Sequence, residues 1–77
     1  MKTSYTFIEN NNIIESFAKD ELSTFNVGDI YISHVDIPYY IIDIKKVFDG
    51  RYNKITILIL IEELPDEDRI LEILRTI

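Results

Sequence analysis

The chain has 77 residues, of which 47% are hydrophobic and 29% are charged, and its formal net charge at pH 7 is −6. This length predicts one compact domain over residues 1–77, and the acidic excess disfavours nucleic-acid backbones and anionic membrane surfaces as partners. Because there is no cysteine, the sequence excludes disulfides and thiolate metal sites.

The N-terminal segment and the apolar runs both argue against a membrane protein. Residues 1–12 lack the basic segment and the apolar core of a signal peptide. The longest unbroken apolar run, Ile57 to Ile61, is far shorter than the roughly 20 residues that span a bilayer. We therefore expect a cytoplasmic protein with no membrane contact.

The first predicted elements are a strand and a helix. Residues 4–8 are strand formers with aromatic rings on one side, and the asparagines at 10–12 end this strand. If Asn12 caps a helix, the apolar residues that follow have helical spacing over residues 13–22. The alternative is a hairpin that turns at the asparagines, with residues 13–17 as its second strand.

The middle of the chain predicts two strands after a connector. The connector covers residues 23–29, where Gly28 is expected to adopt a positive φ or a tight bend. A short strand over residues 30–32 is followed by a kink at Pro38, which cannot donate to a sheet, and by a strand over residues 39–48. Alternation places Tyr40, Ile42, Ile44 and Phe48 on one face of that strand, and Tyr39, Ile41, Asp43, Lys45 and Val47 on the other.

The most apolar element is a strand over residues 54–62. Isoleucines at 55, 57, 59 and 61 lie on one of its faces, and Leu58 and Leu60 lie on the other, so both faces need cover. A two-residue turn at Asp49-Gly50 would join this strand to the preceding one, and a four-residue loop over residues 49–52 would keep the same faces together. We expect the two strands to be antiparallel.

A helix is predicted at the C-terminus. Pro65 fits its first turn, and the acids that follow complement the positive end of a helix. The whole pattern predicts an α+β fold, in which a small antiparallel β-meander carries an N-terminal helix and a C-terminal helix packed on the sheet. The segment FNVGDIY, residues 25–31, followed by a long bent hairpin, resembles the opening of SH3-like small barrels over residues 25–62. We carry no functional residue over from that resemblance.

The sequence contains no arrangement typical of catalysis. The single histidine, His34, lies near Asp29 and Asp36, but a metal site needs three or four convergent ligands and a catalytic base needs a partner. We interpret it as an ordinary surface residue. Gly28 and Gly50 are the only glycines and are far apart, so there is no phosphate loop. We expect no enzyme activity, no metal and no cofactor.

Three groups of residues are candidate binding surfaces. Each also has a structural explanation, namely helix-start acids, second-layer core and the protection of an edge hairpin by lysines. The acidic strip, which would bind a basic partner, consists of Glu62, Glu63, Asp66, Glu67, Asp68 and Glu72. The tyrosine patch, which would bind a protein, consists of Tyr31, Tyr39, Ile41, Leu58 and Leu60. The basic hairpin, which would bind single-stranded nucleic acid, consists of Lys45, Lys46, Arg51, Tyr52 and Lys54.

These surfaces favour a protein-binding function. We expect a small non-catalytic regulator, such as a phage or mobile-element inhibitor of a host enzyme or defence complex. The partner would be a protein, and a homodimer is a further expectation, since self-association stabilises small chains. The alternatives are a nucleic-acid-binding small barrel that uses the basic hairpin and a structural subunit of a larger assembly, although the net charge makes nucleic acid the weaker candidate.

Overall fold

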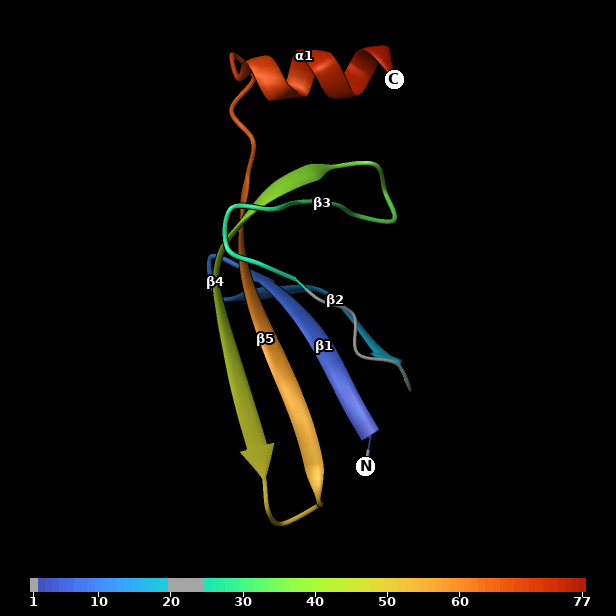
Figure 1. Cartoon of the computed structure of the whole chain (residues 1–77), viewed down its shortest axis with the longest axis vertical. Helices are drawn as coiled ribbons and strands as arrows, with labels where there is room; N and C mark the ends of the chain where they lie inside the picture. The colour runs from blue at the N-terminus through green and yellow to red at the C-terminus, as the bar shows by residue number, and fades with distance from the viewer. Residues whose placement is uncertain (1, 20–24) are drawn as a thin grey trace.

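The protein is a curled, mixed β-sheet with a short C-terminal helix (Figure 1). The computed structural model describes residues 2–19 and 25–77. Within them, five strands form one sheet, and a single helix follows the last strand. The elements are β1 (Lys2–Glu9), β2 (Asn12–Lys19), β3 (Ile30–Ile32), β4 (Pro38–Asp49), β5 (Lys54–Glu63) and α1 (Arg69–Thr76).

Two antiparallel units share the sheet, whose strand order is β2-β1-β5-β4-β3. β1 and β2 form a hairpin, and β3, β4 and β5 form the predicted antiparallel meander. β1 and β5 join the units as a parallel pair, from Lys2 beside Lys54 to Ile8 beside Leu60. The expectation of a purely antiparallel sheet was therefore wrong. A strand that is apolar on both faces belongs in the centre of a sheet, and β1 gives β5 its second neighbour.

The predicted N-terminal helix over residues 13–22 was wrong, because this segment continues the sheet as β2. Asn10 and Asn11 have φ values of 47° and 65°, so both central residues of the turn have the positive φ that a type I′ hairpin needs. In the strand, Phe17 lies opposite Tyr5, and the two rings stack with their centroids 5.5 Å apart. Residues 20–22 of the predicted helix and 23–24 of the predicted connector lie outside the described residues.

The core lies on the concave face of the curled sheet. Its buried side chains come from β1, β4 and β5. Phe25 and Tyr31 cover them, and the Tyr31 ring stacks on Phe7 with a centroid distance of 3.9 Å. β3 therefore lies across β1, although β5 and β4 separate these two strands in the sheet. Gly28, with a φ of 94° as predicted for this glycine, lies in the connector before β3. The buried core residues are Tyr5, Phe7, Tyr39, Ile41, Ile59 and Ile61.

A β-bulge at Ile42 changes which residues of β4 face the core. The pairing with β5 shifts between Ile41 and Asp43, so Ile41 lies on the same face as Ile44. Simple alternation had placed these two residues on opposite faces, and that prediction was wrong. At the other end of β4, Asp49 pairs with Lys54, so the loop covers residues 50–53. The registers predicted from a two-residue turn and from a four-residue loop were therefore both wrong. Near the loop, the same faces of β4 and β5 lie together as predicted.

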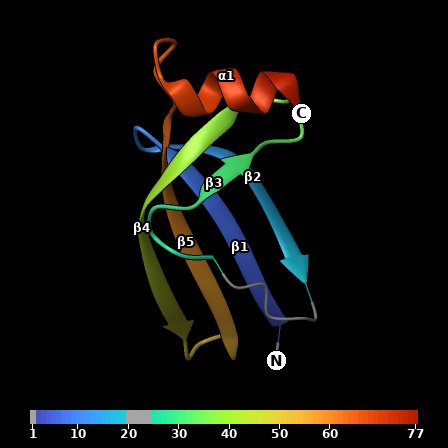
Figure 2. The same ribbon diagram turned by 45° about the horizontal axis from the view of Figure 1, so that its top comes forward.

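The helix α1 lies beyond one end of the sheet instead of covering a face (Figures 1 and 2). Asp68 is its N-cap and accepts a hydrogen bond from the Ile70 amide. The Tyr40 hydroxyl donates to the same carboxylate at 2.5 Å, which fastens the helix to β4. In α1 itself only Leu71 is buried. Two helices packed on the sheet were therefore a wrong prediction, and no helix among the described residues is long and apolar enough to cross a membrane.

Candidate functional site: an acidic cleft between β1 and β5

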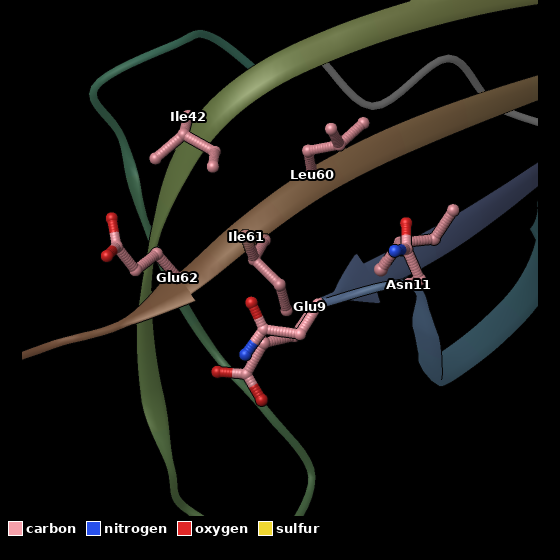
Figure 3. A pocket seen from close by; sticks show the side chains of 8 residues that line it. Glu9, Asn11, Ile42, Leu60, Ile61 and Glu62 are labelled. Carbon is pink, nitrogen blue, oxygen red and sulfur yellow. The ribbon is translucent and has the colours of Figure 1, made fainter.

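A cleft of about 420 Å³ opens where β1 ends beside β5 (Figure 3). This volume falls within the roughly 300–1,000 Å³ of typical ligand pockets. Three parts of the fold meet here: the β1–β2 turn, the bulge of β4 and the C-terminal part of β5. We call it the acidic cleft, and its lining residues are Ile8, Glu9, Asn10, Asn11, Ile42, Leu60, Ile61 and Glu62.

Local backbone features create this cleft. The turn at Asn10 and Asn11 takes the chain away from β5, so β1 stops while β5 continues to Glu63. Opposite, the bulge at Ile42 interrupts the pairing of β4 with β5. Ile42 is 49% exposed and faces the opening. The cleft is thus a gap in the strand pairing with an apolar wall.

The charged groups that line the cleft are all carboxylates. Glu9 and Glu62 are its two charged lining residues, and no basic side chain lines it among the described residues. Negative charges in this region also act on the buried Tyr39 in the core. Burial raises the pKa of the Tyr39 hydroxyl, and the nearby charges of Glu9, Glu63 and Glu15 raise it further. The region therefore favours a cation.

This arrangement is suited to binding a cationic group. An apolar wall with carboxylates beside it fits a lysine or arginine side chain, because such side chains bury their methylene stems and keep the charged end at the polar rim. The cleft can therefore hold a cationic side chain of another molecule.

The structure distributes the predicted acidic strip over several elements. Glu62 and Glu63 point to opposite faces of β5, and only Glu62 lines the cleft. Asp68 is occupied by its hydrogen bonds to Ile70 and Tyr40. The remaining members, Asp66, Glu67 and Glu72, are exposed on the connector and the helix.

The predicted tyrosine patch is divided between two faces. Tyr39 and Ile41 are buried in the core, and Tyr31 packs against it. Leu58 and Leu60 are half-buried on the other face, which α1 leaves open. Only Leu60 of this group lines the acidic cleft.

The residues of the basic hairpin lie near one another in the β4–β5 hairpin, but their side chains do not form one surface. Lys45 pairs with Leu58 and Lys46 with Ile57, so the two lysines point to opposite faces. Arg51 forms a two-pronged ion pair with Asp49, with the closer contact at 3.0 Å, and its guanidinium lies over the Tyr52 ring. The hydrogen bond from Arg51 lowers the pKa of Asp49. The Tyr52 ring is 71% exposed.

His34 has a partner that the sequence did not reveal. Its Nδ1 lies 3.3 Å from Oε2 of Glu15, which links the β3–β4 loop to β2. Burial raises the pKa of the neighbouring Tyr31 to about 12, and the hydrogen bond and charge of Glu15 contribute to that rise. Among the described residues, no three histidine, aspartate or glutamate side chains converge as a metal site.

Sequence reasoning missed six of the eight lining residues as site residues, namely Ile8, Glu9, Asn10, Asn11, Ile42 and Ile61. The signal for the turn was present, because asparagine is the non-glycine residue that most readily adopts a positive φ. The alternative of a hairpin that turns at the asparagines rested on this signal, and the structure confirms that alternative. Comparisons with protein families, with curated proteins and with solved structures found no match to this chain.

Proposed function

We propose that this chain is a non-catalytic protein-binding regulator whose acidic cleft holds a lysine or arginine side chain of a partner protein. The observation that carries the proposal is the composition of the cleft, with an apolar wall of isoleucine and leucine and two carboxylates. A net charge of −6 supports it, because the whole molecule attracts a basic partner. As a regulator, for example an inhibitor of a host enzyme or defence complex, it would act by occupying a basic segment that the partner itself needs.

A peptide titration tests the proposal. The probe is acetyl-Leu-Arg-Leu-amide, and its control is acetyl-Leu-Glu-Leu-amide, each added at low ionic strength to the isotope-labelled chain. We expect the arginine peptide alone to shift the amide resonances of Ile8, Leu60 and Glu62. If neither peptide changes these resonances, the proposal is wrong.

Two charge reversals provide the matched comparison. Glu62→Lys places a cation in the cleft, and Glu72→Lys makes the same change of net charge on the exposed side of α1. We expect Glu62→Lys to weaken binding of the arginine peptide about tenfold, because a close charge pair becomes a repulsion. Glu72→Lys should change the affinity less than about twofold, because a distant exposed charge is screened. Equal effects would show that net charge alone attracts the peptide.

A second candidate function rests on the end of the β4–β5 hairpin. Phe48 and Tyr52 are 59% and 71% exposed there, among the four basic residues of the basic hairpin. Exposed rings beside cations are typical of proteins that bind single-stranded nucleic acid. The test is binding of a thymidine oligonucleotide at low salt, which the double substitution of Arg51 and Lys54 by glutamate should weaken together with its salt dependence. Absence of binding by the unaltered chain would exclude this candidate.

A further inference from the structure

The C-terminal part of β5 lacks a neighbour on one side. β1 pairs with β5 only as far as Ile8 beside Leu60, and then leaves the sheet at the asparagine turn. β4, on the other side, continues to pair with β5 as far as Tyr39 beside Glu63. In the described part of the chain, the segment Ile61–Glu63 is therefore bonded to one strand only. It forms a short open edge in the middle of the sheet.

This open edge borders the acidic cleft. Ile61 and Glu62 belong to both, and Figure 3 shows β5 continuing beyond the end of β1 with the Glu62 side chain at its margin. Glu9 lies across the gap at the end of β1. Glu63 follows Glu62 in the strand and therefore points to the opposite face. Carboxylates thus lie on both faces of the open edge.

We propose that the partner binds as an extended basic segment that adds a short strand to the Ile61–Glu63 edge, in line with β1. The inference rests on the proposed function and specifies the bound conformation. Adjacent residues of a strand point to opposite faces, so two consecutive basic residues place one cation beside Glu62 and the other beside Glu63 and Glu9, which share the face of Ile61. The preferred ligand is therefore a dibasic segment without a helix.

The other sheet edges are less suitable for such a segment. In the described part of the chain, β2 has an open outer edge over eight residues, but none of its residues lines the acidic cleft. The outer edge of β4 beyond Ile41 carries Lys45 and Lys46, whose charges repel a basic segment. Of these three edges in the described part of the chain, the edge at Ile61–Glu63 combines unpaired backbone, the adjacent acidic cleft and complementary charge.

The experiment compares peptides that differ in backbone methylation. The probe is acetyl-Thr-Arg-Arg-Val-Thr-amide, and two analogues carry an N-methyl group on the first or on the second arginine. In a strand, consecutive amides point to opposite sides, so only one of the two analogues loses a hydrogen bond to β5. We expect one analogue to bind about tenfold more weakly, because the methyl group also blocks close approach, and the other to bind like the parent peptide. Bound parent peptide should also slow hydrogen exchange of at least one amide within Ile61–Glu63.

The spacing of the arginines provides a second readout. The isomer acetyl-Thr-Arg-Val-Arg-Thr-amide places both cations on one face and should bind several-fold more weakly. Glu63→Gln should weaken the adjacent-arginine peptide and leave the spaced isomer nearly unchanged, because only the former reaches both faces. Gln is nearly isosteric with Glu, so this variant should retain the fold, which its amide spectrum verifies.

The outcomes separate this inference from the proposed function. If all four peptides bind equally and shift the cleft resonances, strand addition is wrong and the proposed function stands. If none of them binds at low ionic strength, both are wrong. If the amides of Ile61–Glu63 are protected without peptide in a concentration-dependent manner, a second copy of the chain occupies the edge and the inference is overturned.

Discussion

Both faces of β5 carry apolar side chains, but the two faces have different surroundings. On the concave face, Ile59 and Ile61 are buried beneath the curled sheet and its aromatic cover. On the convex face, Leu58 and Leu60 are half-buried, and α1 lies beyond the end of the sheet. A strand that is apolar on both faces needs cover on both faces. The curvature of the sheet decides which of the two faces the chain itself encloses. The described residues leave the other face more open.

The largest expected effect contrasts neighbouring residues on these two faces. We expect Ile59→Ala to lower the free energy of unfolding by about 2–5 kcal/mol, because it leaves a cavity in the core. Leu60→Ala should lower it by about 1 kcal/mol, a typical value for a point substitution. Urea unfolding followed by circular dichroism measures both. If Ile59→Ala does not fold, Ile59→Val with an expected loss of about 0.5–1.5 kcal/mol replaces it. Equal losses on the two faces would contradict the comparison.

The asparagine turn sets where β1 ends, and hence where the convex face opens into the cleft. Asn11→Ala should lower the free energy of unfolding by about 1–2 kcal/mol, since alanine pays a steric cost at the positive φ of this position. Asn11→Gly is the matched control and should be neutral or slightly stabilising. Thermal or urea unfolding distinguishes the two. An alanine variant as stable as the unaltered chain would contradict the hairpin.

The enclosed face should make stability sensitive to alkaline pH. The pKa of Tyr31 is raised to about 12 in the folded protein, mainly by burial, and its ordinary value is 10.0. Between these values the unfolded chain loses the proton first, so the free energy of unfolding falls as pH rises from about 10 to 12. Tyr31→Phe should reduce this slope relative to that of the unaltered chain. Unfolding measured at several alkaline pH values tests the difference.

The smallest global effect concerns the helix at the end of the sheet. Hydrogen bonding to Asp68 raises the pKa of the Tyr40 hydroxyl, as expected for a proton shared with a carboxylate. We expect Tyr40→Phe to speed hydrogen exchange of the α1 amides while exchange in β1 and β5 stays unchanged. Tyr52→Phe serves as the control. Unchanged exchange in α1 would show that Leu71 alone holds the helix.

Much of the fold was predictable where side-chain chemistry dictates local geometry. The isoleucine face of β5, the meander of β3 to β5 and the C-terminal helix follow from alternation, from turn residues and from helical spacing. The helix at residues 13–22 failed because its apolar spacing suits either element. Phe17 was the deciding residue, because its contacts with Tyr5 and Phe7 exist only when β2 lies beside β1. A sequence does not show contacts made only after folding.

The candidate site was less predictable than the fold. Glu62 was identified as an acidic residue, but its partner in the cleft, Glu9, lies more than half the chain away in sequence. No glycine or proline marks the bulge at Ile42. Because of this bulge, Tyr39 and Ile41 both lie on the core face and not on the face that alternation predicted. A one-residue shift in a strand reverses every following side chain. Surfaces inferred from alternation alone were therefore divided between the two faces.

The parallel pairing of β1 with β5 also has a consequence for how the chain acquires its structure. β1 is synthesised well before the strand beside which it lies, because Lys2 pairs with Lys54 and Ile8 with Leu60. Such long-range contacts slow folding, since the intervening chain must be ordered before they form. During translation, the β1–β2 hairpin therefore lacks its neighbouring strand until β5 has been made.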